Sequence, residues 1–145
     1  LPGWYMYNQE GSVDWIGREF SNDQFVQINP FQSNQASVIT WLITPSFELQ
    51  DPATLTFNTT VAFEQQEGLT VWISTDFDGS DVENANWTEL NANIASSNDN
   101  YVEEDSGDVD LSAFSGTAYI AFRYEGDGNS NTTLYQLDDV KVEKQ

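Results

Sequence analysis

The stretch TLTFNTTVAF, residues 54–63, decides the fold class of this chain. Its odd-numbered positions are mostly apolar and hold Leu55, Phe57, Thr59, Val61 and Phe63. The residues between them are Thr or Asn as far as position 60. Because successive side chains of a strand point to opposite faces, this alternation predicts a half-buried β-strand whose apolar set, Phe63 included, points inward.

The same period of two recurs along the chain, and helical patterns are almost absent. Further inward sets are Leu69, Val71 and Ile73, and then Ile120, Phe122 and Tyr124. Residues 38–44 form a more continuously apolar strand that Pro45 ends. Additional strands are expected at residues 5–8, 24–28, 87–90, 102–111 and 135–142. About eight or nine strands in 145 residues predict a single all-β domain, an antiparallel β-sandwich of the jelly-roll type.

The last predicted strand changes its inward face half-way along. Tyr135 and Leu137 share one parity, whereas Val140 and Val142 share the other. A β-bulge at Asp138-Asp139 would restore the alternation. It would also turn one acidic side chain inward, which is costly unless the carboxylate is paired or ligates a cation.

Composition excludes several classes of function. The chain has four Lys plus Arg against 24 Asp plus Glu, a formal net charge of -20, and neither Cys nor His. Such a surface repels phosphate backbones and anionic lipids, so we expect no nucleic-acid partner and no direct membrane insertion. What remains is carboxylates, amides, hydroxyls and an aromatic content of 14%, which suits neutral ligands and hard cations.

The order of several segments resembles a known family. These segments are residues 41–45, 53–57, 73–79, 87–90, 109–116, 119–124 and 137–142. Together they are similar to choice-of-anchor J domains and to cleaved-adhesin domains. The resemblance implies a non-catalytic jelly-roll sandwich attached to secreted or cell-surface proteins of Bacteroidota, related in architecture to carbohydrate-binding modules with a structural calcium. Residues 1–145 are then one module excised from a larger extracellular or cell-surface protein, with tethered catalytic or surface domains as partners.

The first candidate binding site is the outer face of a sheet. Trp72 has the opposite parity to the inward set of residues 69–73, and it stands where the similar domains more often have a small aliphatic residue. Tyr119, Arg123 and Asn58 also face outward by parity. An aromatic ring with guanidinium, amide and hydroxyl donors can stack on and hydrogen-bond a neutral sugar. The alternative is that a loop or a neighbouring domain covers Trp72.

A second candidate site lies in the loops at one end of the sandwich, where Trp15 or Tyr101 could line it. Tyr101 falls in residues 91–107, a polar stretch expected to be a long surface loop. Trp41 and Trp87 lie within predicted strands and are expected in the core.

Two acidic groupings are candidate calcium sites. Asp76, Asp78 and Asp81 surround Gly79, so a sharp turn could aim their oxygens at one Ca²⁺, although a solvated acidic turn has the same spacing.

The second grouping combines Asp138 or Asp139 at the predicted bulge with Glu10 and Asn8, because the terminal strands of jelly rolls are often neighbours. We expect one structural Ca²⁺.

These observations favour a non-catalytic carbohydrate-binding module for a neutral polysaccharide, for example a β-1,3-glucan such as laminarin. The alternative is a protein-binding adhesin or a spacer module of a cell-surface protein. A pair of carboxylates would suffice for glycoside hydrolysis, but no pair is marked by a setting that would raise a pKa, and we expect no enzyme activity.

Overall fold

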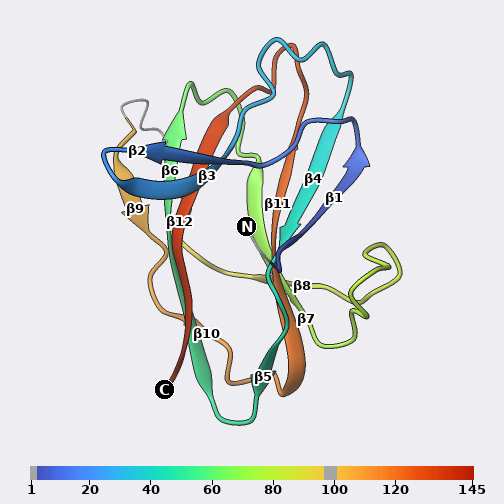
Figure 1. Ribbon diagram of the computed structural model, residues 1–145, viewed down its shortest axis with the longest axis vertical. Coiled ribbons are helices and arrows are strands. Elements are labelled where there is room, and N and C mark those ends of the chain that lie inside the picture. Colours follow the sequence, from blue (N-terminus) through green and yellow to red (C-terminus); the bar gives the residue numbers. More distant parts are fainter. Residues whose placement is uncertain (1–2, 97–100) are drawn as a thin grey trace.

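The chain folds into two six-stranded antiparallel sheets that face each other (Figure 1). The computed structural model describes residues 3–96 and 101–145. In these residues there are twelve strands. The described residues contain no helix that could cross a membrane.

We name the two sheets A and B. Sheet A has the order β1-β4-β11-β7-β8, with β5 beside β11. Its strands are β1 (Tyr5–Glu10), β4 (Val38–Ile43), β5 (Phe47–Leu49), β7 (Leu69–Ser74), β8 (Thr88–Leu90) and β11 (Gly116–Gly126). Sheet B has the order β10-β6-β12-β3-β2, with β9 beside β6. Its strands are β2 (Ile16–Phe20), β3 (Asp23–Ile28), β6 (Ala53–Ala62), β9 (Glu103–Asp105), β10 (Val109–Asp110) and β12 (Leu134–Lys144).

The antiparallel β-sandwich is confirmed, with more strands than the periodicity predicted. Strand β2 is exposed along its whole length, so no apolar alternation marks it. Strand β5 has only three residues, too few to show a period. The segment 102–111 contains two short strands, β9 and β10. Part of the expected surface loop at 91–107 is therefore strand β9, and residues 97–100 lie outside the described residues.

The main core lies between the two sheets. The inward sets predicted in β7 and β11 are buried, as are Leu55, Phe57 and Val61 of β6. Phe57 of sheet B meets Phe122 of sheet A edge-on, with ring centroids 5.1 Å apart. This contact joins β6 of sheet B to β11 of sheet A across the core.

Phe63 does not belong to this inward set, and its predicted position is wrong. Strand β6 ends at Ala62, and Phe63 has a φ of 51°. This left-handed backbone is rare for a bulky residue, and it turns the ring away from the core. The Phe63 side chain is 63% exposed.

The predicted β-bulge in the last strand is confirmed. The register between β12 and β6 shifts between Asp138 and Lys141, so that Asp139 and Val140 lie opposite the single residue Phe57. Asp139 takes the extra position with a φ of 55°. The expectation that an acidic side chain turns inward is wrong, because Asp138 lines the hollow over the outer face of sheet B and Asp139 is exposed.

The contact between Phe57 and Phe122 gives a test of the core. Substituting Phe57→Ala should lower the free energy of unfolding by about 3 kcal/mol, because it removes a fully buried ring and leaves a cavity. Urea unfolding measures this loss. The control Phe20→Ala, at an exposed position of β2, should cost less than about 0.5 kcal/mol. Equal losses for the two variants would contradict this core.

Candidate functional site

A groove with a volume of about 800 Å³ lies over the outer face of sheet B. This volume is in the range of ligand-binding clefts. Strands β2, β3, β6, β9 and β12 contribute to it, together with residues that follow β3 and β6. The lining residues are Arg18, Glu19, Phe20, Asp23, Phe25, Gln27, Asn29, Thr60, Phe63, Tyr101, Glu103, Leu134, Gln136 and Asp138. We call it the sheet B groove.

Aromatic rings line the sheet B groove. Phe20 and Phe63 are each 63% exposed, Tyr101 is 47% exposed, and Phe25 is half-buried. Phe63 and Tyr101 pack edge-on, with centroids 6.4 Å apart. Both have left-handed backbone, with φ values of 51° and 59°. Strained backbone that holds two bulky rings at the edge of a groove is a feature of ligand-binding sites.

Amides and a hydroxyl lie between these rings. Gln136 of β12 donates from Nε2 to Oε1 of Gln27 on β3, over 3.0 Å. This bond leaves the Gln136 oxygen and the Gln27 nitrogen free, and no other described residue contacts them or the Thr60 hydroxyl by a hydrogen bond. Free amide and hydroxyl groups beside aromatic rings can recognise the hydroxyls of a sugar.

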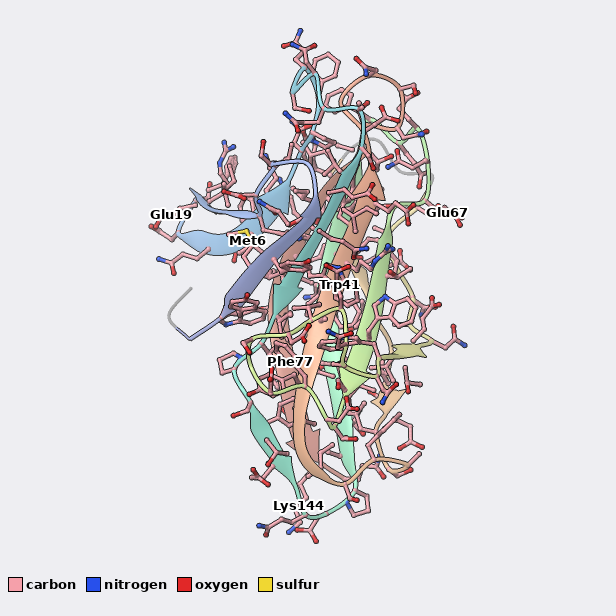
Figure 2. The ribbon with its side chains drawn as sticks, turned by 90° about the vertical axis from the view of Figure 1, so that its right-hand side faces the viewer. Met6, Glu19, Trp41, Glu67, Phe77 and Lys144 are labelled. Carbon is pink, nitrogen blue, oxygen red and sulfur yellow. The ribbon has the colours of Figure 1, made fainter. Side chains whose placement is uncertain are left out.

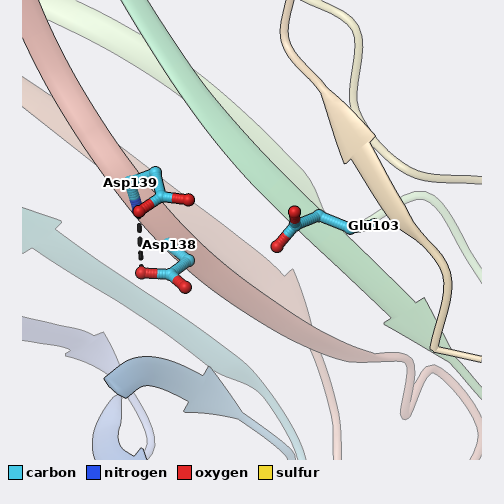
Figure 3. Close-up of side chains that lie close together, drawn as sticks. All are labelled: Glu103, Asp138 and Asp139. Atoms are coloured by element: carbon cyan, nitrogen blue, oxygen red, sulfur yellow. Dashed lines mark hydrogen bonds between the residues drawn. The ribbon is translucent and has the colours of Figure 1, made fainter. Parts of the chain in front are cut away.

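Three carboxylates come together beside the floor of the groove. Oxygens of Glu103, Asp138 and Asp139 all lie within 4.8 Å of one another (Figure 3). The Asp139 backbone N–H donates to Asp138 over 2.8 Å. The Asn58 amide donates to both Asp139, over 3.0 Å, and Glu103, over 3.3 Å. The bulge in β12 therefore brings acidic groups from β9 and β12 together around Asn58 of β6.

The pKa values of Asp138 and Glu103 are raised. Burial, a hydrogen bond with Asp23 and repulsion from Asp139 and Asp23 raise the pKa of Asp138 to about 6. Burial and the charges of Asp139 and Asp23 also raise the pKa of Glu103. The sequence marks out no carboxyl pair whose setting would raise a pKa, because the acids come together only through the pairing of β9 and β12 with β6.

The groove carries a net negative charge. Arg18 is its one cation among the described residues, against the acids Glu19, Asp23, Glu103 and Asp138. Anionic ligands are repelled by such a surface, whereas neutral ligands are not.

The acidic loop at 76–81 is built differently from the predicted calcium site. Asp76 accepts from the Ser74 hydroxyl and from both the backbone and the side-chain amide of Asn86. Asp78 accepts from the backbone N–H groups of Ser80 and Asp81. These hydrogen bonds lower the pKa values of Asp76 and Asp78.

Asp81, the third predicted ligand, accepts from the amide of Asn84. Among the described residues, the only group of three acids close enough to share a cation is Glu103, Asp138 and Asp139. Asp76, Asp78 and Asp81 therefore serve as turn acceptors, and their prediction as one converging site is wrong.

Glu10 is also separate from the acids of sheet B. It ends β1 in sheet A, where it accepts a hydrogen bond from the Ser37 hydroxyl. Asn8 of the same strand bonds Asp14 and Thr40. The predicted combination of Glu10 and Asn8 with Asp138 or Asp139 is wrong, because among the described residues the acid that lies within 4.8 Å of both aspartates is Glu103.

The outer face of sheet A carries a second, smaller apolar cluster. Trp41, Phe77 and Val82 are buried in it, and Trp72, Trp87 and Tyr119 pack against it. Figure 2 looks onto this face, with Trp41 near its middle and Phe77 within the loop between β7 and β8. Trp41 is 8% exposed, so it is buried as predicted, but in this cluster and not between the sheets. Trp87 is half-buried at its edge.

The predicted sugar platform is divided between two faces. Trp72, Tyr119 and Arg123 lie on the outer face of sheet A, as parity predicted. Asn58 lies on sheet B among the carboxylates, so it cannot act with Trp72.

Of the loop-end candidates, Tyr101 is in the sheet B groove. Trp15 is 1% exposed in the main core, and its expected role in a binding site is wrong.

Residues 44–142 match the sequence family described as a domain of unknown function, DUF5017. The chain belongs to this family. No curated protein matches the chain. The resemblance to choice-of-anchor J domains stays a prediction.

Solved structures share the fold of this DUF5017 domain. A cleaved adhesin domain of Lys-gingipain from Porphyromonas gingivalis aligns with a TM-score of 0.65 at 18% identity, over 100% of this chain and 92% of its own. A second similar structure is the family 11 carbohydrate-binding module from Clostridium thermocellum, in complex with a β-1,3-1,4-mixed-linked tetrasaccharide. It aligns with a TM-score of 0.58 at 10% identity, over 99% of this chain and 90% of its own. The CBM22-1 xylan-binding domain of Xyn10C from Paenibacillus barcinonensis aligns with a TM-score of 0.54 at 12% identity, over 99% of this chain and 87% of its own. The expected likeness to cleaved-adhesin domains and to carbohydrate-binding modules is confirmed at the level of the fold.

Several groove residues were missed by sequence reasoning. Phe20 belongs to a strand with no apolar alternation, and Phe63 was assigned to the core. Phe25, Gln27 and Gln136 have the outward parity of predicted strands, and that signal could have identified them. What was missing was the knowledge that β3 and β12 are neighbours.

The raised pKa of Asp138 predicts a pH dependence of stability. Its pKa is about 6 in the folded chain and near 3.8 when unfolded, so the folded state binds the extra proton between these values. Stability should therefore rise as pH falls from about 7.5 to 5 and be lost as pH rises through 6. Because solvent screens part of the effect, we expect about 1 kcal/mol in urea unfolding with a chelator present. Asp138→Asn should be more stable than wild type at pH 7.5 and respond less to acid. An unchanged pH response in this variant would contradict the assignment.

Calcium binding stays a prediction, now limited to Asp138 and Asp139 with Glu103 beside them. A cation held only by the folded state raises the melting temperature. We expect a higher melting temperature in Ca²⁺ than in chelator at pH 7, and no such difference in Asp138→Asn. A matched Asp78→Asn variant, altered in the separate loop, should keep the full response. Equal wild-type melting temperatures in Ca²⁺ and in chelator would mean that no Ca²⁺ binds at this site.

Proposed function

We propose that this DUF5017 domain is a non-catalytic carbohydrate-binding module that holds a neutral polysaccharide in the sheet B groove. The observation that carries the proposal is the set of exposed rings at Phe20, Phe63 and Tyr101 around free amide and hydroxyl groups on one face of a sheet. Aromatic rings stack on the apolar faces of sugars, and the polar groups meet their hydroxyls. The shared fold with two carbohydrate-binding modules supports this proposal.

The charge of the groove favours a neutral glycan. Four acids face one arginine there, and the whole chain carries a net charge of -20. Uronic-acid and sulfated polymers are repelled by such a field at low to moderate salt. A β-1,3-glucan such as laminarin is our first choice of ligand.

The arrangement of the carboxylates favours binding without hydrolysis. Glycosidases need two carboxyl groups on either side of the bond that is cleaved. Glu103, Asp138 and Asp139 lie beside one another on one face, and the Asn58 amide bonds two of them. All three acids would therefore lie on the same side of a sugar placed over them, so they do not flank its glycosidic bond.

In this proposal the domain is part of a larger extracellular or cell-surface chain whose other domains it connects to the glycan. The adhesin or spacer role is the alternative, supported by the fold shared with a cleaved adhesin domain. Binding of a polysaccharide by the isolated domain separates the two.

Affinity electrophoresis tests the proposal, with gels that contain laminarin, mixed-linked β-glucan, xylan, mannan or alginate. We expect a neutral glucan to retard the wild-type domain and alginate to have no effect. The double variant Phe63→Ala/Tyr101→Ala should bind about tenfold more weakly, because two stacking rings are lost. The control Phe31→Ala removes an equally exposed ring outside the groove and should bind as wild type does.

Three results would contradict the proposal. They are the absence of retardation by every polysaccharide, full binding by the double variant, and reducing sugar released from the retarding glucan by the wild-type domain. The first of these would favour the adhesin or spacer role.

A further inference from the structure

A separate pocket of about 400 Å³ lies on the outer face of sheet A, where the loop between β7 and β8 meets the sheet. Its walls are Trp41, Trp72 and Trp87, and its rim includes Gln9, Glu83 and Arg123. We call it the tryptophan pocket. The two sheets form the two layers of the sandwich (Figure 1). The tryptophan pocket lies over the outer face of one sheet and the sheet B groove over that of the other, so they are on opposite sides.

Hydrogen bonds fix the orientation of all three indoles. The indole N–H of Trp72 donates to the Thr70 hydroxyl over 2.8 Å, and that of Trp41 donates to Gln9 over 3.0 Å. Trp87 donates to the carbonyl of Val82 over 2.9 Å. The polar edge of each ring is thus occupied, and a ligand meets the ring faces. Trp41 lies 6.5 Å from Trp72 and 5.3 Å from Trp87, centroid to centroid.

Burial divides these rings into two roles. Trp41 is buried and supports the cluster, as Phe77 does under the loop. Trp72 and Trp87 stay half-exposed at the pocket, although a purely structural cluster would gain by burying them. Their exposed faces form a preorganised stacking surface, which needs little ordering when a ligand binds.

The rim is polar and contains charged groups. The Arg123 guanidinium lies 5.5 Å from the centre of the Trp41 ring and pairs with Glu125 over 3.0 Å. Glu83 accepts a hydrogen bond from Tyr7. The side-chain amide nitrogen of Gln9 has no partner among the described residues. With Glu125 included, the charged groups here are one cation and two acids, which disfavours an anionic ligand. The side chains of Gln9, Glu83 and Arg123 offer donors and acceptors to hydroxyls.

We propose that the tryptophan pocket is a second carbohydrate subsite that stacks a sugar ring of the same neutral polysaccharide on Trp72 and Trp87. The inference rests on the proposed function for the identity of the ligand, but it uses different residues on the other face of the sandwich. A domain with both subsites binds two segments of polysaccharide at once and cross-links them.

Calorimetric titration with a short linear β-1,3-glucan oligosaccharide counts the subsites. We expect the wild-type domain to bind two equivalents of the oligosaccharide. One equivalent should remain in Trp72→Ala, and one in the groove variant Phe63→Ala/Tyr101→Ala. The affinity of the pocket should fall about tenfold or more in Trp72→Ala. Phe31→Ala is the control, since Phe31 is an exposed ring that lines neither the tryptophan pocket nor the sheet B groove, and this variant should keep both equivalents. Thermal melts without ligand verify that each variant is folded.

Tryptophan fluorescence gives a second readout, because no Trp lines the sheet B groove. In the groove variant, the oligosaccharide should still change the emission, and in Trp72→Ala that change should be lost. A single equivalent that disappears only in the groove variant overturns the second subsite and leaves the proposed function standing. A single equivalent that disappears only in Trp72→Ala overturns binding in the groove and supports the pocket. No binding of any neutral glucan overturns both.

Discussion

The β-bulge at Asp138-Asp139 is the constraint on which the rest of sheet B depends. Strand β12 is central, with β6 on one side and β3 on the other, so its register controls both neighbours. Tyr135 and Leu137 face the core before the bulge, and Val140 and Val142 pack toward it afterwards. Without the extra residue, one of these pairs would point outward. The same extra residue sets two aspartates side by side, so the core packing and the acidic floor of the groove have one cause.

The acidic side chains of this protein serve two opposite purposes. In the loops, Asp78 and Asp127 accept hydrogen bonds from backbone N–H groups, which lowers their pKa values and stabilises the turns. In the groove, burial and repulsion raise the pKa values of Asp138 and Glu103. The loop acids therefore contribute stability at neutral pH, whereas the groove acids cost stability there. A cost that packing could avoid with an uncharged residue is consistent with a role in binding.

How far the sequence predicted this structure depends on the range of the interactions. Parity within a strand identified the outward position of Trp72 and the bulge at Asp138, because both follow from neighbouring residues. It could not assign Asn58 and Trp72 to different sheets, because that depends on β6 pairing with β12 and β7 pairing with β11. Trp15 stands between two strands, where no period predicts its burial. The sheet B groove needed the most distant pairings of all, and only Tyr101 and Asp138 of its lining were among the predicted site residues.

The two outer faces differ because of what covers them. On sheet A, the loop between β7 and β8 places Phe77 and Val82 over the strands, and only its margin leaves rings accessible. On sheet B, the exposed β2 extends the face, and the rings of Phe63 and Tyr101 stand at the other side. A sandwich must bury one face of each sheet, but nothing in that requirement fixes the other two faces. The outer faces are therefore free to carry ligand sites, and in this chain aromatic rings with free polar neighbours lie on both.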